Sequence, residues 1–221
     1  MREAIVQRLR ATRMPADLVG AATRAIPPGT AEAWFRLPLT PAAVLLPLVQ
    51  RRGEWHLVLT QRQANLPEHP GQVALPGGRV SNEDTDLIAT ALRESAEEIG
   101  LQPQAVTVAG FVKPQPIISG YAVLPVVGFV ADGFTPQPDH REVAAVFEVP
   151  LQFLLQPGNC RASMRERAGV ALRVWEYQHS GFRIWGATAK IIREFTQLLA
   201  AGDSLAPAAA PPAGSAGEGH G

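Results

Sequence analysis

Residues 76–101 of the chain read PGGRVSNEDTDLIATALRESAEEIGL, and this stretch decides the fold. Its second half has the spacing of an amphipathic helix, which we expect to run from Thr85 to Gly100. Asp84 stands at the position of an N-cap, and Gly100 is the kind of residue that ends a helix. The glycines before the helix can form a turn whose backbone approaches a metal ion or a phosphate. The stretch therefore predicts a glycine turn followed by a helix.

Acidic residues are concentrated on this helix. Residues 79–98 hold six acidic and two basic side chains, which gives a local net charge of −4. Glu94, Glu97 and Glu98 fall within an arc of roughly 100° and repel one another unless cations screen them. Carboxylate oxygens are the ligands that Mg²⁺ prefers, and Arg93 can brace a carboxylate through a bidentate contact. Taken alone, such a cluster usually marks a solvated helix face, and the glycines before the helix add the alternative of a divalent-metal site.

The composition of the whole chain excludes several classes of protein. The 221 residues include 20 basic and 20 acidic side chains, so the formal net charge is zero and a strongly basic nucleic-acid-binding domain is excluded. Cys160 is the single cysteine, which excludes a disulfide framework and a cysteine zinc site. No apolar run reaches the ~18 residues of a membrane span, and the first residues lack the apolar core of a secretion signal. We expect a cytoplasmic protein without nucleic-acid or membrane partners.

Apolar runs on both sides of the acidic helix predict strands and a few further helices. The expected strands are 42–49, 55–60, 105–112, 121–131, 144–151, 170–177 and 182–185, and the further helices lie in 1–14 and 187–201. Pro47 suggests that the first strand is an edge or carries a bulge. We divide the chain into an N-terminal helix and linker (1–35), one domain (36–201) and an Ala/Pro/Gly-rich tail (202–221) that we expect to be disordered. The expected class is an α/β or α+β sandwich.

The stretch from Gly78 to Leu101 contains the pattern G-x5-D-x8-R-E-S-A-E-E-I-G-L. This pattern closely resembles the Nudix box, which is usually written G-x5-E-x7-R-E-U-x-E-E-x-G-U, where U is an apolar residue. Asp84 replaces the glutamate, one extra residue separates it from Arg93, and Ser95 stands at an apolar position. The resemblance implies the Nudix α/β/α sandwich with a mixed β-sheet.

Residues 59–78, LTQRQANLPEHPGQVALPGG, resemble an element of the bacterial coenzyme A pyrophosphatase branch of this family. The residues that match this element are Thr60, Arg62, Gly71, Pro76, Gly77 and Gly78. The positions that differ are Gln63, Pro67 and Leu75. An arginine in place of Pro67 would be a natural ligand for the 3′-phosphate of coenzyme A (CoA). Residues 119–129, 142–151 and 185–194 also resemble this branch.

The resemblance implies that CoA or acyl-CoA is cleaved to 3′,5′-ADP and (acyl-)4′-phosphopantetheine, with Mg²⁺ or Mn²⁺ as cofactor. The metal-ligand positions fall on Glu94, Glu97 and Glu98, with the carbonyl of Gly77 as a further ligand. We expect the general base to be Glu97 on the helix or Glu142 outside it, and Glu142 can instead be an ordinary surface residue.

Further residues are assigned with their alternatives. Arg93 joins the catalytic set, and Asp84 can bond either Arg93 or a metal-bound water. Arg62, Gly78 and Tyr121 are expected to bind substrate. Arg62 can instead be an ordinary surface arginine, and Tyr121 can instead pack in the core.

Two other functions stay open at this stage. The substrate can be ADP-ribose, NADH, a dinucleoside polyphosphate or a modified nucleoside triphosphate. The chain can also be a regulatory module of the same fold without catalysis, although the intact Arg93, Glu94, Glu97 and Glu98 argue against this. The sequence also leaves the oligomeric state open, a homodimer included.

Overall fold

The longest strand, β1 (Thr40–Arg51), runs through the middle of the larger sheet in the computed structural model, which describes residues 1–201. It is parallel to β7 (Tyr121–Val130) on one side and antiparallel to β2 (Glu54–Arg62) and β4 (Gly77–Arg79) on the other. The main strand order is β3-β2-β1-β7-β5, while β6 pairs with β7 and β8 with β2. The remaining members are β3 (Val73–Ala74), β5 (Val106–Phe111), β6 (Gln115–Ile117) and β8 (Val143–Pro150). The mixed sheet confirms the predicted class.

Pro47 lies in a central strand, so the prediction of an edge or a bulge at this position was wrong. Alternate backbone N–H groups of a strand point to the same side, so the N–H that Pro47 lacks would point as that of Leu45 does. The N–H of Leu45 donates to the carbonyl of Pro76. On this side β1 pairs with β4 up to Val44 and with β2 from Leu48 onward. Proline is tolerated because it stands where β1 changes partners.

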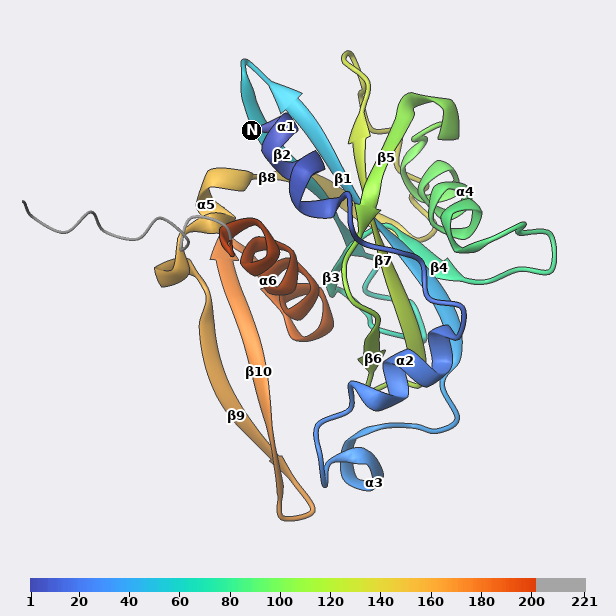
Figure 1. Ribbon diagram of the computed structural model, residues 1–221, viewed down its shortest axis with the longest axis vertical. Coiled ribbons are helices and arrows are strands. Elements are labelled where there is room, and N and C mark those ends of the chain that lie inside the picture. The colour runs from blue at the N-terminus through green and yellow to red at the C-terminus, as the bar shows by residue number, and fades with distance from the viewer. Residues whose placement is uncertain (202–221) are drawn as a thin grey trace, which may run out of the picture.

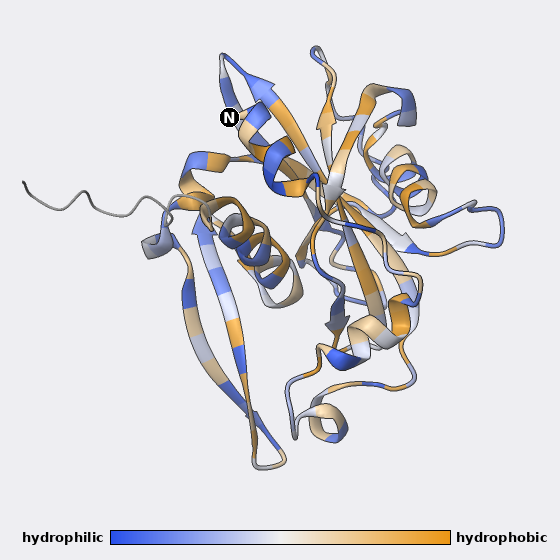
Figure 2. Cartoon of the chain, in the orientation of Figure 1, coloured by the Kyte–Doolittle hydropathy of each residue, from blue (hydrophilic) through white to orange (hydrophobic). Residues whose placement is uncertain are grey.

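Helices cover both faces of the larger sheet (Figure 1). On one face, α4 (Leu87–Ile99) and α2 (Leu18–Arg24) pack in a core with odd-numbered residues of β1 such as Leu45. On the other, α1 (Arg2–Leu9) and α6 (Gly186–Ala200) pack in a core that contains even-numbered residues of the same strand. Figure 2 shows hydrophobic residues concentrated along the strands that lie between these helices. This arrangement is an α/β/α sandwich.

A second, three-stranded sheet has the order β11-β10-β9 and extends from the α6 side of the molecule (Figure 1). Its strands β10 (Val170–His179) and β11 (Phe182–Trp185) confirm the two strands predicted there, and they pair antiparallel. The sequence did not predict β9 (Arg161–Arg167), whose residues RASMRER are all exposed. A strand without a buried face leaves no hydrophobic periodicity to detect.

Several smaller elements also differ from the expectations. The helix predicted within residues 1–14 ends at Leu9, and the predicted strand 144–151 ends at Pro150, before a short helix. The further elements that were not predicted are α2, α3 (Ala31–Trp34), α5 (Leu151–Leu155), the short strands β3, β4 and β6, and the 3-10 turns Pro103–Ala105 and Pro157–Asn159. The predicted tail 202–221 lies outside the described residues. Among residues 1–201, no helix combines the length and the apolar character needed to cross a membrane.

Substitutions in the first helix, α1, test whether this helix belongs to the folded core. Ile5 and Leu9 are fully buried in the core beneath α6, while Val6 on the same helix is 41% exposed. We expect Leu9→Ala to lower the free energy of unfolding by about 2–4 kcal/mol, because it removes buried methyl groups and leaves a cavity. The matched Val6→Ala change should stay within about 0.5 kcal/mol. Urea unfolding of both variants measures the difference, and equal effects would show that α1 does not belong to the core.

Candidate active site

The acidic helix α4 is capped at Asp86, whose side chain accepts a hydrogen bond of 2.8 Å from the N–H of Ala89. The prediction that Asp84 caps the helix was therefore wrong, as was the predicted start at Thr85. Asp84 stays in the preceding loop, where it accepts hydrogen bonds from the N–H of Ser81 and the hydroxyl of Thr90. From this loop position the Asp84 carboxylate faces the side of the helix that carries Arg93.

Arg93 ties this loop to the helix and to the sheet. Its Nε and Nη2 donate to the two carboxylate oxygens of Asp84 at 2.8 and 3.0 Å, and Nη2 also donates to the carbonyl of Arg79 at 3.0 Å. Its Nη1 donates to Glu94 at 2.9 Å and to Glu97 at 3.3 Å. The Arg93 hydrogen bonds lower the pKa of Asp84, and the Asp84 bonds raise the pKa of Arg93. Of the two roles predicted for Asp84, the structure has the contact with Arg93.

Gly77 and Gly78 lie in strand β4 and pair with β1, so the prediction of a glycine turn before the helix was wrong, and they bring the backbone of β4 up to the acidic helix. A Cβ on Gly77, whose φ is 148°, would lie 2.4 Å from the carbonyl oxygen of Ala43. A Cβ on Gly78 would lie 2.6 Å from the carboxylate oxygens of Glu94. The N–H of Gly77 donates to Oε2 of Glu98 at 3.3 Å. Glycine is needed at position 77, where a side chain would meet the backbone of β1, whereas a side chain at position 78 would displace the carboxylate of Glu94.

Glu98 is the most buried carboxylate of the helix, with only 7% of its side chain exposed. Burial raises the pKa of Glu98 to about 8, although the N–H of Gly77 and the guanidinium of Arg62 at 3.9 Å act in the opposite direction. Burial also raises the pKa of Glu94. The charge of Glu142 adds to both shifts. These groups are held where their negative charge is unfavourable unless a cation joins them.

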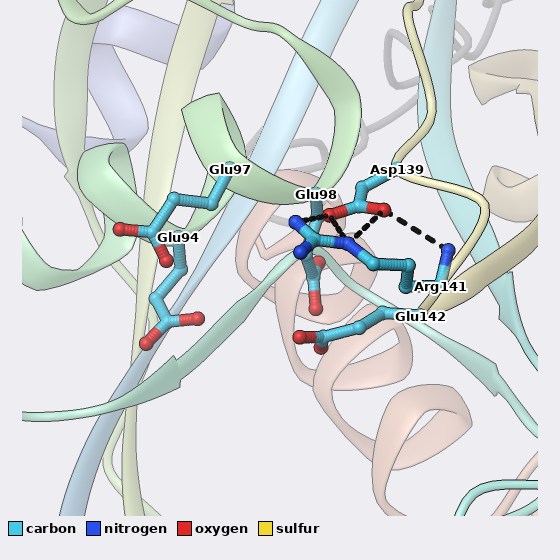
Figure 3. A pocket seen from close by; sticks show the side chains of 6 residues that line it. All are labelled: Glu94, Glu97, Glu98, Asp139, Arg141 and Glu142. Carbon is cyan, nitrogen blue, oxygen red and sulfur yellow. Dashed lines mark hydrogen bonds and ion pairs between the residues drawn. The ribbon is translucent and has the colours of Figure 1, made fainter.

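A pocket of about 240 Å³ opens between α4 and the loop before β8 (Figure 3). Its lining residues are Glu94, Glu97, Glu98, Asp139, Arg141 and Glu142. Main-chain hydrogen bonds fix the loop to the end of the helix: the N–H of Gln137 donates to Ile99, and that of Asp139 to Glu98, both at 2.9 Å. Four of the predicted site residues therefore meet in one pocket. Sequence reasoning missed Asp139 and Arg141, because a loop carries no periodic signal that tells where it packs.

The predicted substrate-binding residues Arg62, Gly78 and Tyr121 do not line this pocket. Arg62 is beside Glu98, and Gly78 is beside Glu94. Tyr121 packs partly buried against the core, and its hydroxyl bonds Glu68 at 3.2 Å and the guanidinium of Arg79. Of its two predicted roles, Tyr121 has core packing in this structure, with its hydroxyl at the surface.

The donor chemistry of the pocket fits a hard divalent cation, since it offers several carboxylates of which two resist ionisation. Within residues 1–201, no three His, Cys, Asp or Glu side chains are already gathered as closely as bound-metal ligands are. Arg93 Nη1 contacts both Glu94 and Glu97 and supplies positive charge to their carboxylates.

Comparison with known proteins assigns the chain to a family. The sequence model of the NUDIX domain matches residues 38–167. The chain belongs to the Nudix family. A Nudix hydrolase of Salmonella paratyphi B, NudL, which its name describes as uncharacterized, is 45% identical over 153 residues that cover 69% of this chain and 79% of the relative. NudL of Salmonella newport gives the same values. The chain is a Nudix hydrolase, and its α/β sandwich with a mixed sheet is a Nudix fold.

Solved structures with similar folds come from other organisms. A MutT protein of Methanosarcina mazei is 19% identical, covers 76% of this chain and 99% of its own, and has a TM-score of 0.48. The Ap4A hydrolase of C. elegans is 21% identical, covers 50% of this chain and 80% of its own, and has a TM-score of 0.44.

Two departures from the Nudix box have structural reasons. Ser95, at an apolar position of the motif, is fully buried, and its hydroxyl donates to the carbonyl of Ala91 at 2.7 Å. The polar group is therefore satisfied inside the helix itself. Asp84 has a shorter side chain than the usual glutamate, yet it reaches both Nε and Nη2 of Arg93 from the loop.

The contact between Asp84 and Arg93 gives a prediction for stability. The Asp84 side chain is 3% exposed, so Asp84→Ala leaves an arginine without its main partner and should cost about 3 kcal/mol. Asp86→Ala, which removes only the helix cap, should cost about 1 kcal/mol. Because the pKa of Asp84 is lowered on folding, its contribution is complete above the usual Asp pKa of about 3.9 and declines as the pH falls below it.

Chemical denaturation at pH 7 and at successively lower pH measures this contribution. The gap between wild type and Asp84→Ala should narrow in acid, while the Asp86→Ala protein provides the comparison. A gap for Asp84→Ala no larger than that for Asp86→Ala at pH 7 would contradict the central role of this ion pair.

Proposed function

We propose that this Nudix hydrolase cleaves the diphosphate bond of CoA or acyl-CoA and releases 3′,5′-ADP and (acyl-)4′-phosphopantetheine. The observation that carries the proposal is the pocket in which the buried Glu98 meets Glu94, Glu97 and Glu142. A diphosphate is resistant to attack because its oxygens are negatively charged, and cleavage requires that this charge be neutralised. A carboxylate pocket that favours added cations is suited to this task.

The CoA assignment draws its support from the loop 63–72. This loop follows Arg62 and closes on itself through hydrogen bonds from Arg62 N–H to Gln72 and from Gly71 N–H to Gln63. Arg62, at the start of this loop, lies 3.9 Å from Glu98, so the loop begins next to the acidic site. At Pro67 the expected arginine is missing, but Arg79 brings a guanidinium to the adjacent Glu68 at 3.3 Å. We propose that Arg79 supplies the positive charge for the 3′-phosphate.

Individual roles follow from the positions of the side chains. We propose that Glu94, Glu97 and Glu98, with the carbonyl of Gly77, hold Mg²⁺ or Mn²⁺. The bound ions would neutralise phosphate oxygens and lower the pKa of water. Glu142 faces the helix carboxylates across the pocket and Glu97 is the more exposed of the helix group, so each is a candidate for the general base. Arg93 keeps the glutamates in place.

A panel of substrates tests the proposed function. Purified protein is supplied with Mg²⁺ or Mn²⁺ and with CoA, acetyl-CoA, ADP-ribose, NADH, a dinucleoside polyphosphate or a modified nucleoside triphosphate, and the products are identified by mass spectrometry. We expect the highest kcat/KM for CoA or its thioester, with 3′,5′-ADP among the products. If CoA is the slowest of the set, the CoA assignment is wrong. If no compound is hydrolysed, the proposed cleavage of CoA is overturned.

The role of Glu98 can be tested apart from the substrate. Glu98→Gln should reduce turnover by about 10²–10³-fold, because it removes a charge that the diphosphate chemistry depends on. In wild type, added Mg²⁺ or Mn²⁺ should raise the melting temperature, since a ligand that binds the folded state stabilises it. This rise should be much smaller for Glu98→Gln and unchanged for Glu83→Gln, an exposed glutamate before the helix. Equal metal-induced shifts in wild type and Glu98→Gln would overturn the metal site.

A further inference from the structure

Among the described residues that line the pocket, Arg141 is the one basic side chain beside the carboxylates. The five acidic side chains of the lining would repel a diphosphate, which carries the same sign of charge. In the proposed function, divalent ions compensate part of this repulsion. Arg141 lies at the same pocket and can compensate more of it.

The backbone of residue 141 is held in a defined position relative to the acidic helix. The N–H of Arg141 donates to Oδ1 of Asp139 at 3.0 Å, and the N–H of Glu142 donates to the carbonyl of Asp139 at 3.0 Å. Asp139 in turn donates its own N–H to the carbonyl of Glu98. The turn 139–142 is therefore attached to α4 at Glu98, and the attachment does not depend on the Arg141 side chain.

The side chain of Arg141, by contrast, is 89% exposed and held only by Asp139 among the contacts of the described residues. Its Nε lies 3.0 Å from each carboxylate oxygen of Asp139. An ion pair this exposed contributes little net free energy in water and is exchanged easily. In Figure 3 the guanidinium extends from the turn toward the side of the pocket where Glu94 and Glu97 lie.

A guanidinium binds a phosphate with the same pair of parallel N–H groups that it uses for a carboxylate. We propose that Arg141 recruits the substrate by exchanging the carboxylate of Asp139 for oxygens of the diphosphate. This inference rests on the proposed function of the pocket. It assigns Arg141 a role in substrate binding, and Asp139 holds the side chain ready until substrate arrives.

Steady-state kinetics of Arg141→Gln and Arg141→Lys test the inference, with the best substrate of the panel and saturating Mg²⁺. We expect Arg141→Gln to raise KM by about 10–100-fold, the usual effect of losing a charged hydrogen bond, and to change kcat by less than about threefold. Arg141→Lys keeps the charge without the paired N–H groups and should fall between this variant and wild type. Calorimetric titration with α,β-methylene-ADP, which is not hydrolysed at the bridged bond, should show the same order of dissociation constants.

Arg167→Gln is the matched control, because it removes the same charge from an exposed arginine of β9, on the side of the molecule away from α4 (Figure 1). Its KM should equal that of wild type. A KM of Arg141→Gln equal to that of Arg167→Gln overturns the inference, and so does a loss confined to kcat. Either result leaves the proposed function intact, because the substrate panel and Glu98→Gln judge it separately. If wild type neither binds nor hydrolyses any diphosphate, both proposals fail.

Discussion

The guanidinium of Arg93 is the contact on which the arrangement of the site depends. It joins the loop at Asp84, the backbone of β4 at Arg79, and the helix carboxylates Glu94 and Glu97. Arginine has five N–H donors in one plane, and here they face partners from three directions. Lysine has a single charged centre and could not hold these groups at once. These acidic groups repel one another, so the positive charge of Arg93 both positions them and reduces the destabilisation that their repulsion causes.

Around this contact the molecule concentrates unfavourable charge and stabilises the site from outside it. Glu98 is nearly buried, and its pKa is raised to about 8. The surrounding scaffold consists of two apolar cores, one on each face of the larger sheet. The burial of apolar side chains in these cores stabilises the fold and offsets the repulsion between the like charges of the pocket. The zero net charge of the chain is thus an average over an acidic site and basic segments elsewhere, such as β9.

Local patterns were sufficient for much of the fold. The helix with Glu94 to Glu98 and its end at Gly100 follow from periodicity and from the conformational freedom of glycine, which adopts a φ of 70° there. The β1–β2 hairpin and the closing helix α6 follow from apolar runs in the same way. The prediction failed at Asp84, since two neighbouring aspartates compete for the cap and only the path of the loop selects Asp86. It also failed at Pro47, which is tolerated in a central strand because β1 changes partners there. It failed at β9 because this exposed strand forms by pairing with β10 and has no hydrophobic periodicity of its own.

The sequence by itself determined which charged groups stand together on one helix: three glutamates at helical spacing and an arginine among them, a pattern that depends only on neighbours along the chain. The tertiary structure decided what surrounds those groups. It buried Glu98, placed Glu142 across from the helix, and put Asp139 and Arg141 at the same pocket through main-chain hydrogen bonds to the end of α4. The physical reason is that helix faces are set by a local period, whereas a loop takes its position from contacts between residues far apart in the chain.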